Sequence, residues 1–180
     1  MSGIDPFTEQ DLVHAEQIEE VWEATNSDGS DLLNELKAAI QRYVVLPSEH
    51  HMVAVTLWIA ATHCVPAFDY ATRLVVRSAE KRSGKSRLLE IIDATCHRPL
   101  RAVNATVPAI FRSLEGDAPP TLILDEADTI FGSRKVAEQN EDLRGLLNAG
   151  FQRGLPVLRT VGPQHEPKEF PTFAMATLAG

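Results

Sequence analysis

The most constraining feature of the chain is a short, uninterrupted apolar run that ends in two acids, Thr121-Leu-Ile-Leu-Asp125-Glu126. A run without polar alternation is typical of a strand that is covered on both faces. Further strands are predicted at 74–78, 100–103, 157–161 and 170–177, and helices at 88–96, from 106 onward and at about 138–150. Strands that alternate with helices predict an α/β domain with a mostly parallel sheet flanked by helices.

The part of the chain before Arg73 is predicted to be helical and acidic. Apolar residues at helical spacing indicate helices at 9–25, 31–43 and 48–63. The last of these is apolar almost all round, so we expect it to be packed on most sides. Residues 1–72 hold two basic and twelve acidic side chains, whereas residues 73–180 hold fifteen basic and thirteen acidic ones.

Three segments follow from this division. Residues 1–8 resemble a cloning-vector scar, residues 9–72 form an acidic helical lead-in, and residues 73–180 form the α/β core. An acidic lead-in gives no reason to expect nucleic-acid binding there, because that binding depends on neutralising phosphates.

Composition places the chain among ordinary globular proteins. It has 180 residues, of which 44% are hydrophobic and 23% charged, which suits about one domain. Its longest strongly apolar stretch, residues 52–61, is shorter than the ~18 residues of a membrane span. Without a basic-then-apolar leader, we expect a cytoplasmic protein with no membrane attachment. Cys64 and Cys96 are too few for a disulfide framework, and we expect both to be buried free thiols.

A candidate phosphate loop, Ser78-Ala-Glu-Lys-Arg-Ser-Gly-Lys-Ser86, lies between a predicted strand and a predicted helix. The Walker A pattern is G-x-x-x-x-G-K-[ST], and here Ala79 replaces the first glycine. In such loops backbone amides surround a phosphate at a helix N-terminus. Lys85 can reach the β/γ-phosphates, and the Ser86 hydroxyl can hold Mg²⁺. The candidate nucleotide-binding residues are Ala79, Glu80, Lys81, Arg82, Ser83, Gly84, Lys85, Ser86 and Arg87.

The acids after the apolar run form a candidate Walker B motif. Asp125, at the end of a predicted strand, is expected to bind the Mg²⁺ that Ser86 holds. Glu126 is then placed to orient or deprotonate an attacking water. Taken alone, the basic cluster could be a solvated face, and the two acids could be a helix cap with a first-turn acid. Both motifs in this order, on predicted strands, indicate a nucleotide-binding domain.

With these motifs the chain resembles the ASCE branch of P-loop NTPases, which includes AAA+ and helicase-like ATPases. More narrowly, it resembles an actinobacterial and phage domain family whose members often occur beside primase-like or replication modules. The segments that carry this likeness are 78–90, 124–132, 142–150 and 170–180. The resemblance implies Mg-dependent ATP binding and hydrolysis in a DNA-replication or mobile-element task, with DNA or replication proteins as partners.

The resemblance also bears on the end of the chain. It implies that strand 170–177 is the sensor strand, with Thr177 as its polar sensor. It further implies that Gly180 precedes the last core strand, the arginine finger and the lid. On that basis we expect slow hydrolysis and a mainly monomeric state for this chain, and a homo-oligomer for a longer form.

Several alternatives stay open. A phosphotransferase would need a pocket for a second substrate, and a nucleotide-binding interaction module would bind without turnover. A hairpin expected at 157–170, with a polar turn through Lys168, could contact nucleic acid through Arg159 and Lys168 or be an ordinary surface hairpin. Arg144 and Arg153 could face a neighbouring subunit or solvate a helix. We expect helix-face histidines at His50, His51 and His63, and packing tryptophans at Trp22 and Trp58.

Overall fold

The structure is a computed structural model, and it describes residues 29–78, 83–101, 107–116, 118–125, 141–163 and 165–180. The chain divides into two compact units, residues 1–35 and 36–180. Helix α2 (Gly29–Tyr43) begins in the first unit, and all other elements named below belong to the second. The proposed scar, the predicted helix at 9–25 and Trp22 lie outside the described residues.

A four-stranded sheet forms the centre of the second unit, and its strands are all parallel. Its order is β1 (Arg73–Val76), β6 (Ala176–Ala179), β3 (Thr121–Leu124), β2 (Pro99–Arg101). The last strand in the chain therefore lies between the first and the third. Every residue of β3 is buried, as the unbroken apolar run predicted. The expected α/β class with a parallel sheet flanked by helices is confirmed.

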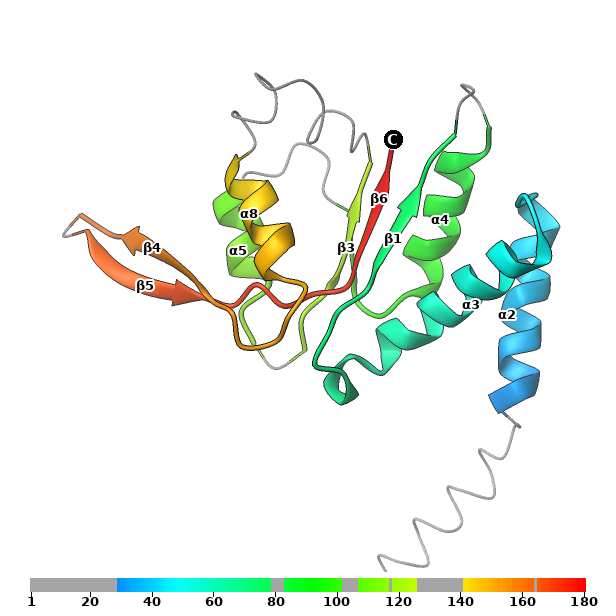
Figure 1. The fold of residues 1–180 in the computed structure, drawn as a ribbon, viewed down its shortest axis with the longest axis horizontal. Coiled ribbons are helices and arrows are strands. Elements are labelled where there is room, and N and C mark those ends of the chain that lie inside the picture. Colours follow the sequence, from blue (N-terminus) through cyan, green and yellow to red (C-terminus); the bar gives the residue numbers. More distant parts are fainter. Residues whose placement is uncertain (1–28, 79–82, 102–106, 117, 126–140, 164) are drawn as a thin grey trace, which may run out of the picture. The chain divides into compact units, whose positions relative to one another are not determined.

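Helices cover the sheet on both faces (Figure 1). One face carries α3 (Glu49–His63) and α4 (Lys85–Thr95), and the short 3-10 turn Val65–Ala67 follows α3. The other face carries α5 (Val107–Ser113) and α8 (Glu141–Ala149). Side chains on successive strand residues alternate between the faces, because the pleat has a period of two.

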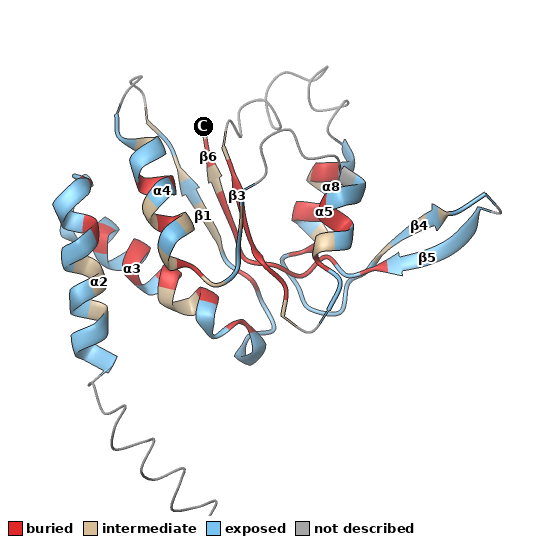
Figure 2. Ribbon diagram, turned by 180° about the vertical axis from the view of Figure 1, so that it is seen from behind, coloured by how far each residue is buried: buried red, intermediate tan, exposed pale blue. Residues whose placement is uncertain are grey.

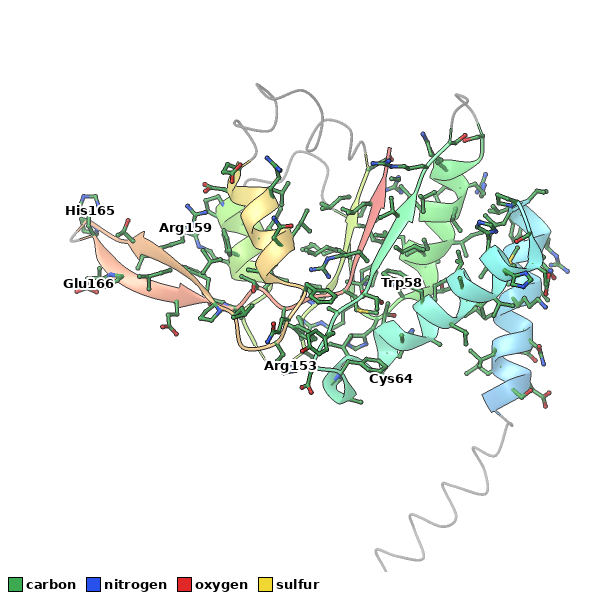
Figure 3. All side chains as sticks on the ribbon, viewed as in Figure 1. Trp58, Cys64, Arg153, Arg159, His165 and Glu166 are labelled. Atoms are coloured by element: carbon green, nitrogen blue, oxygen red, sulfur yellow. The ribbon has the colours of Figure 1, made fainter. Side chains whose placement is uncertain are left out.

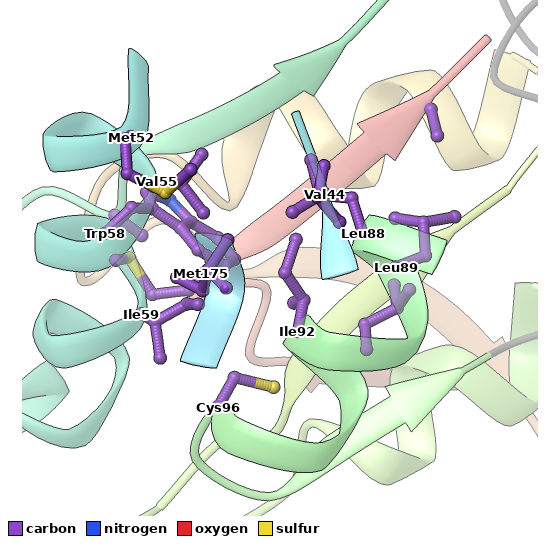
Figure 4. Close-up of a cluster of buried hydrophobic side chains, with 14 of the residues drawn as sticks. Val44, Met52, Val55, Trp58, Ile59, Leu88, Leu89, Ile92, Cys96 and Met175 are labelled. Carbon is purple, nitrogen blue, oxygen red and sulfur yellow. The ribbon is translucent and has the colours of Figure 1, made fainter. Parts of the chain in front are cut away.

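Two hydrophobic cores result from this alternation. In the first, Ile123 and Met175 pack with buried residues of α3 and α4 such as Ile59 and Ile92 (Figure 4). In the second, Leu122 and Leu124 pack with buried residues of α5 and α8. Figure 2 shows the burial concentrated on β3 and β6 and on the helix faces turned toward them. Trp58 is buried in the first core, as predicted.

Helix α3 is open on one side, so the expectation that it is packed on most sides is wrong. Val53 and Leu57 are 40% and 52% exposed, while Met52, Val55 and Ile59 of the same helix are buried. The apolar residues run round the helix, but the side that carries Met52, Val55 and Ile59 is the one that packs into the first core. The histidines His50, His51 and His63 are exposed on this helix, as expected.

The two cysteines differ. Cys64 is exposed, which corrects the expectation that both thiols are buried. It caps the C-terminus of α3 and so lies beyond the face that packs on the sheet. Cys96 follows α4 and is buried, and burial raises the pKa of its thiol to about 11. Both are free thiols.

A two-stranded antiparallel hairpin, β4 (Val157–Val161) with β5 (Glu166–Phe170), projects from the second unit (Figure 1). The hairpin at 157–170 is confirmed, but the polar turn through Lys168 is not, because Lys168 pairs with Arg159 inside the ladder. The strand predicted at 170–177 is also corrected. It is divided into the end of β5 at Phe170 and the start of β6 at Ala176. Pro171 follows Phe170 and has no N–H with which to continue a ladder.

Among the helices in the described part of the chain, none combines the length and the apolar character that crossing a bilayer requires.

Candidate functional site

The carboxyl ends of the four parallel strands share one edge of the sheet, called here the carboxyl edge. The opposite end, where the strands begin, is called the amino edge. The candidate phosphate loop leaves β1 and the candidate acids leave β3, so both motifs begin at the carboxyl edge. Register supports this, because Val76 pairs with Ala179, and Leu124 pairs with the adjacent Leu178. β6 alone separates the two strands.

The connections change faces at this edge. After β1 the chain enters α4 on one face of the sheet, and after β3 it reaches α8 on the other. In open α/β sheets, ligands bind outside the carboxyl ends of the strands where the connections diverge in this way. The site predicted from the two motifs therefore lies at the expected place in this fold.

Gly84 and Lys85 form the start of α4. Gly84 caps the helix with φ of 89°, a left-handed conformation that strains any residue with a Cβ, and its carbonyl accepts the N–H of Leu88 at 3.0 Å. Lys85 is the first helical residue and is partly buried. Its Nζ donates to the Gly180 carbonyl oxygen at 2.9 Å, which places the ammonium at the carboxyl edge, beside the end of β6.

The other described loop residues are exposed. Ser83 and Ser86 are open to solvent at the start of α4, and Arg87 pairs with Glu90 on the same helix at 2.6 Å. Ser86 Oγ is accessible to a ligand at the helix N-terminus. Ala79, Glu80, Lys81 and Arg82 lie outside the described residues.

Asp125 follows β3 directly and is partly exposed. Its Oδ2 lies 3.7 Å from Nη2 of Arg101, the last residue of β2. The structure thus places the carboxylate at the same edge as Lys85. Glu126, the predicted base, lies outside the described residues.

Thr177 lies away from this group. It is the second residue of β6, has no exposed surface, and its hydroxyl donates to the Leu74 carbonyl oxygen at 3.2 Å. The hydroxyl therefore joins β6 to β1 within the sheet, two residues before the strand reaches the carboxyl edge.

The basic residues of the hairpin are paired with acids of the helices. Arg159 lies 2.6 Å from Asp142 at the start of α8, and Lys168 lies 2.7 Å from Glu115, just after α5. Figure 3 shows Arg159 on the side of the hairpin toward these helices and His165 and Glu166 near its tip. These pairs attach the hairpin to the domain, which favours the ordinary surface hairpin of the two interpretations left open.

Arg144 and Arg153 also have intramolecular partners. Arg144 pairs with Glu141 one turn earlier, at 3.3 Å. Arg153, predicted to solvate a helix or face another subunit, instead donates to the carbonyl oxygens of Val65 and Phe68 at 2.8 and 3.0 Å. It lies after α8 and not on a helix.

Two arginines with clear roles were missed by sequence reasoning. Arg101 faces Asp125, and nothing in the sequence shows which strand lies beside β3. The Arg73 guanidinium donates to the carbonyl oxygens of Ala71 and Leu147, at 3.2 and 2.9 Å, and to that of Ala174. Burial lowers the pKa of Arg73 to about 10, so it stays protonated at neutral pH. The only sequence signal is that a charged residue opens an apolar strand.

Two cavities lie beside the hairpin. One, of about 380 Å³, is lined by residues of the hairpin, α5 and α8 that include Phe111, Arg112 and Arg159. The other, of about 560 Å³, lies near the base of the hairpin and includes Arg153 and Phe173. Concave apolar cavities are common ligand sites. We favour the carboxyl edge, because it alone combines a candidate phosphate loop with an acid at a strand end.

Among the described residues, no group of three or more His, Cys, Asp or Glu side chains is arranged to hold a metal ion. No family model matches this chain, and no curated protein sequence matches it.

Proposed function

We propose that this chain binds a Mg–nucleoside triphosphate at the carboxyl edge and hydrolyses ATP there, as a P-loop NTPase of the ASCE branch. The observation that carries the proposal is the strand order. With β6 between β1 and β3, the candidate phosphate loop and the candidate acid begin one strand apart at the same edge. Two motifs that are forty residues apart in the sequence, from Lys85 to Asp125, thereby become neighbours.

Each described group suits its proposed role. The Gly84 conformation turns the chain sharply into α4, whose N-terminal N–H groups favour an anion. The Lys85 ammonium is a mobile point charge of the kind that binds phosphates. Its hydrogen bond to a carbonyl oxygen is readily exchanged for one to a phosphate oxygen.

The oxygen donors present at this edge fit Mg²⁺. The Asp125 carboxylate and the Ser86 hydroxyl are hard ligands, and Mg²⁺ is usually held by one or two protein oxygens together with substrate phosphates. When bound, the ion would neutralise charge on the β- and γ-phosphates. Asp125 and Ser86 would position it.

Glu126 supplies the proposed chemistry. As the residue that directly follows Asp125 in the sequence, it is the proposed acceptor of a proton from a water that attacks the γ-phosphate. An acid at this sequence position favours hydrolysis over transfer to a second substrate. A task in DNA replication or in a mobile element rests on the family resemblance alone.

The test is turnover of Mg-ATP by the whole chain, with and without DNA. We expect phosphate release by the wild type and at least ~100-fold less by Glu126→Gln, which keeps the shape but cannot accept the proton. Nucleotide affinity should be the same in both. The matched control Glu166→Gln removes one carboxylate from the exposed hairpin and should hydrolyse like the wild type.

Three results would contradict the proposal. Wild-type protein that binds no nucleotide removes its basis. A labelled product other than phosphate makes the protein a phosphotransferase. Nucleotide binding without any release of phosphate makes it a binding module.

A further inference from the structure

Arg101 and Asp125 form a cross-strand ion pair at the carboxyl edge. Arg101 is the last residue of β2 and pairs in register with Ile123 of β3, so Asp125 comes just beyond it on the neighbouring strand. The side chains converge to 3.7 Å between Nη2 and Oδ2. Both are about one-third exposed, at 32% and 37%.

Stability does not explain this pair well. Ion pairs with this much solvent access contribute little to folding, because water and salt screen them. A charge on the edge strand β2 discourages pairing with another sheet, but that role needs no particular partner. What distinguishes Arg101 is the identity of the acid that it faces, which is the proposed ligand of Mg²⁺.

We propose that Arg101 is the resting counter-ion of Asp125, and that it must release this carboxylate before a divalent cation can bind there. The inference rests on the proposed function of Asp125. A guanidinium and a metal ion compete for the same oxygen, so the pair lowers the affinity of the site for free metal. A triphosphate offers oxygens that can accept the released guanidinium. Arg101 thereby makes metal and nucleotide binding cooperative, and it selects the metal–nucleotide complex over the free ion.

The test measures the binding of Mn²⁺, a spectroscopic substitute for Mg²⁺, by electron paramagnetic resonance of the free ion and without nucleotide. We expect Arg101→Gln to bind Mn²⁺ about tenfold more tightly than the wild type. This is the scale expected when one unit charge about 4 Å away is removed from a partly exposed site. Arg101→Lys keeps the charge and should remain within about twofold of the wild type.

Two controls make the result specific. Arg112→Gln removes the same charge from an exposed position on α5 and should leave Mn²⁺ affinity unchanged. Asp125→Asn in the Arg101→Gln background should abolish the gain. Melting temperatures verify that each variant is folded.

Unchanged or weaker Mn²⁺ binding by Arg101→Gln would overturn the inference, as would an equal gain in Arg112→Gln. Detectable Mn²⁺ binding by none of the variants would overturn it too, because Asp125 would then not be a metal ligand. A parallel titration with ATP separates this outcome from failure of the proposed function. Wild-type protein that binds Mg-ATP while Arg101→Gln leaves Mn²⁺ affinity unchanged refutes only the role of Arg101. A tenfold gain without any ATP binding refutes the nucleotide proposal and the cooperativity with nucleotide, but supports the competition between Arg101 and the metal ion for Asp125.

Discussion

Cationic side chains occupy both edges of the parallel sheet, but their partners differ. At the amino edge, Arg73 and Arg153 donate to backbone carbonyl oxygens at the ends of helices, strands and turns. At the carboxyl edge, Arg87 and Arg101 pair with partly exposed carboxylates, and Lys85 makes a hydrogen bond to one carbonyl oxygen. The first set joins segments that are distant in the sequence. The second set can exchange its partners for those of a ligand.

Charge alone therefore does not mark a functional edge. The guanidinium of Arg73 is largely buried and satisfies three carbonyl groups, so it is committed to the fold. The exposed and exchangeable pairs at the carboxyl edge cost little to break. We therefore expect substitutions at the amino edge to lower stability and those at the carboxyl edge to lower ligand affinity.

The largest expected effect is that of Arg73→Met. It keeps much of the side-chain volume but leaves buried carbonyl oxygens of Ala71, Leu147 and Ala174 without their donor, and we expect about 3–5 kcal/mol of destabilisation. Urea unfolding measures it. The control Arg112→Met, at an exposed position, should change stability by less than about 0.5 kcal/mol. A loss below about 1 kcal/mol for Arg73→Met would end the distinction between the edges.

Lys85→Ala, in contrast to Arg73→Met, should lower nucleotide affinity and leave the stability of the nucleotide-free protein almost unchanged. With Mg-ATP near 100 times its dissociation constant, wild-type protein should gain about 2.7 kcal/mol of stability, and the variant should gain almost none. Without nucleotide, the two should agree within about 1 kcal/mol, because Lys85 makes one partly exposed hydrogen bond. Thermal unfolding with and without Mg-ATP tests both statements. The control Lys168→Ala removes a lysine from the hairpin, and Mg-ATP should stabilise it as much as the wild type. Equal increases in melting temperature with Mg-ATP in all three proteins would refute the role of Lys85.

Gly150, at the amino edge, and Gly84, at the carboxyl edge, should respond differently to the same substitution. A Cβ on Gly150, beside Arg73, would overlap the Thr172 carbonyl oxygen and lie 2.9 Å from that of Leu146, so Gly150→Ala should destabilise by about 1–3 kcal/mol. A Cβ on Gly84 meets open space, and Gly84→Ala should lose only the ~1–2 kcal/mol of a left-handed backbone. Urea unfolding compares them. Only Gly84→Ala should also weaken nucleotide binding, and weaker binding by Gly150→Ala would contradict this assignment.

The smallest effect concerns the thiols. Exposed Cys64 should react with a thiol reagent in the native protein, whereas buried Cys96 should react only on unfolding. Mass spectrometry of the labelled peptides distinguishes them. Because folding raises the pKa of Cys96 to about 11, from 9.0, the folded state retains this proton longer than the unfolded state. The contribution of Cys96 to stability is therefore complete below about pH 9 and decreases as the pH rises toward 11. Equal labelling of both thiols in the native protein would contradict the labelling prediction, because it would show that the reagent reaches Cys96 without unfolding.

Much of the fold could be predicted from local patterns. The apolar run at β3 and the periodicity of α2 and α3 placed these elements within a residue or two, because each pattern is set by burial on a face that recurs along the element. The prediction of a single strand at 170–177 was wrong, because β5 ends at Phe170 and β6 begins at Ala176. Phe170, Phe173, Ala174 and Met175 make this segment mostly apolar, and a break made by Pro171 does not change that pattern.

The site was predictable in its motifs but not in its neighbours. Glycine, lysine and hydroxyl at fixed spacing identify the start of α4, and the acid after an apolar run identifies the end of β3. The pairing of Arg101 with Asp125 depends on which strands are adjacent, and two of the carbonyl groups that Arg73 contacts are 74 and 101 residues away in the sequence. Cys64 was misplaced for the same reason, because its exposure depends on where α3 ends relative to the sheet.

The central position of β6 also determines when the sheet can form during synthesis. β1 pairs only with β6 among the described strands, in a register that joins Arg73 to Ala176, and β3 reaches β1 only through β6. Until residues 176–179 have been made, β1 has no partner and β3 has only β2. Closing such a long loop is slow, and unpaired apolar strands expose a folding chain to aggregation. The strand that brings the two motifs together is therefore also the one whose late synthesis keeps β1 unpaired until residues 176–179 have been made.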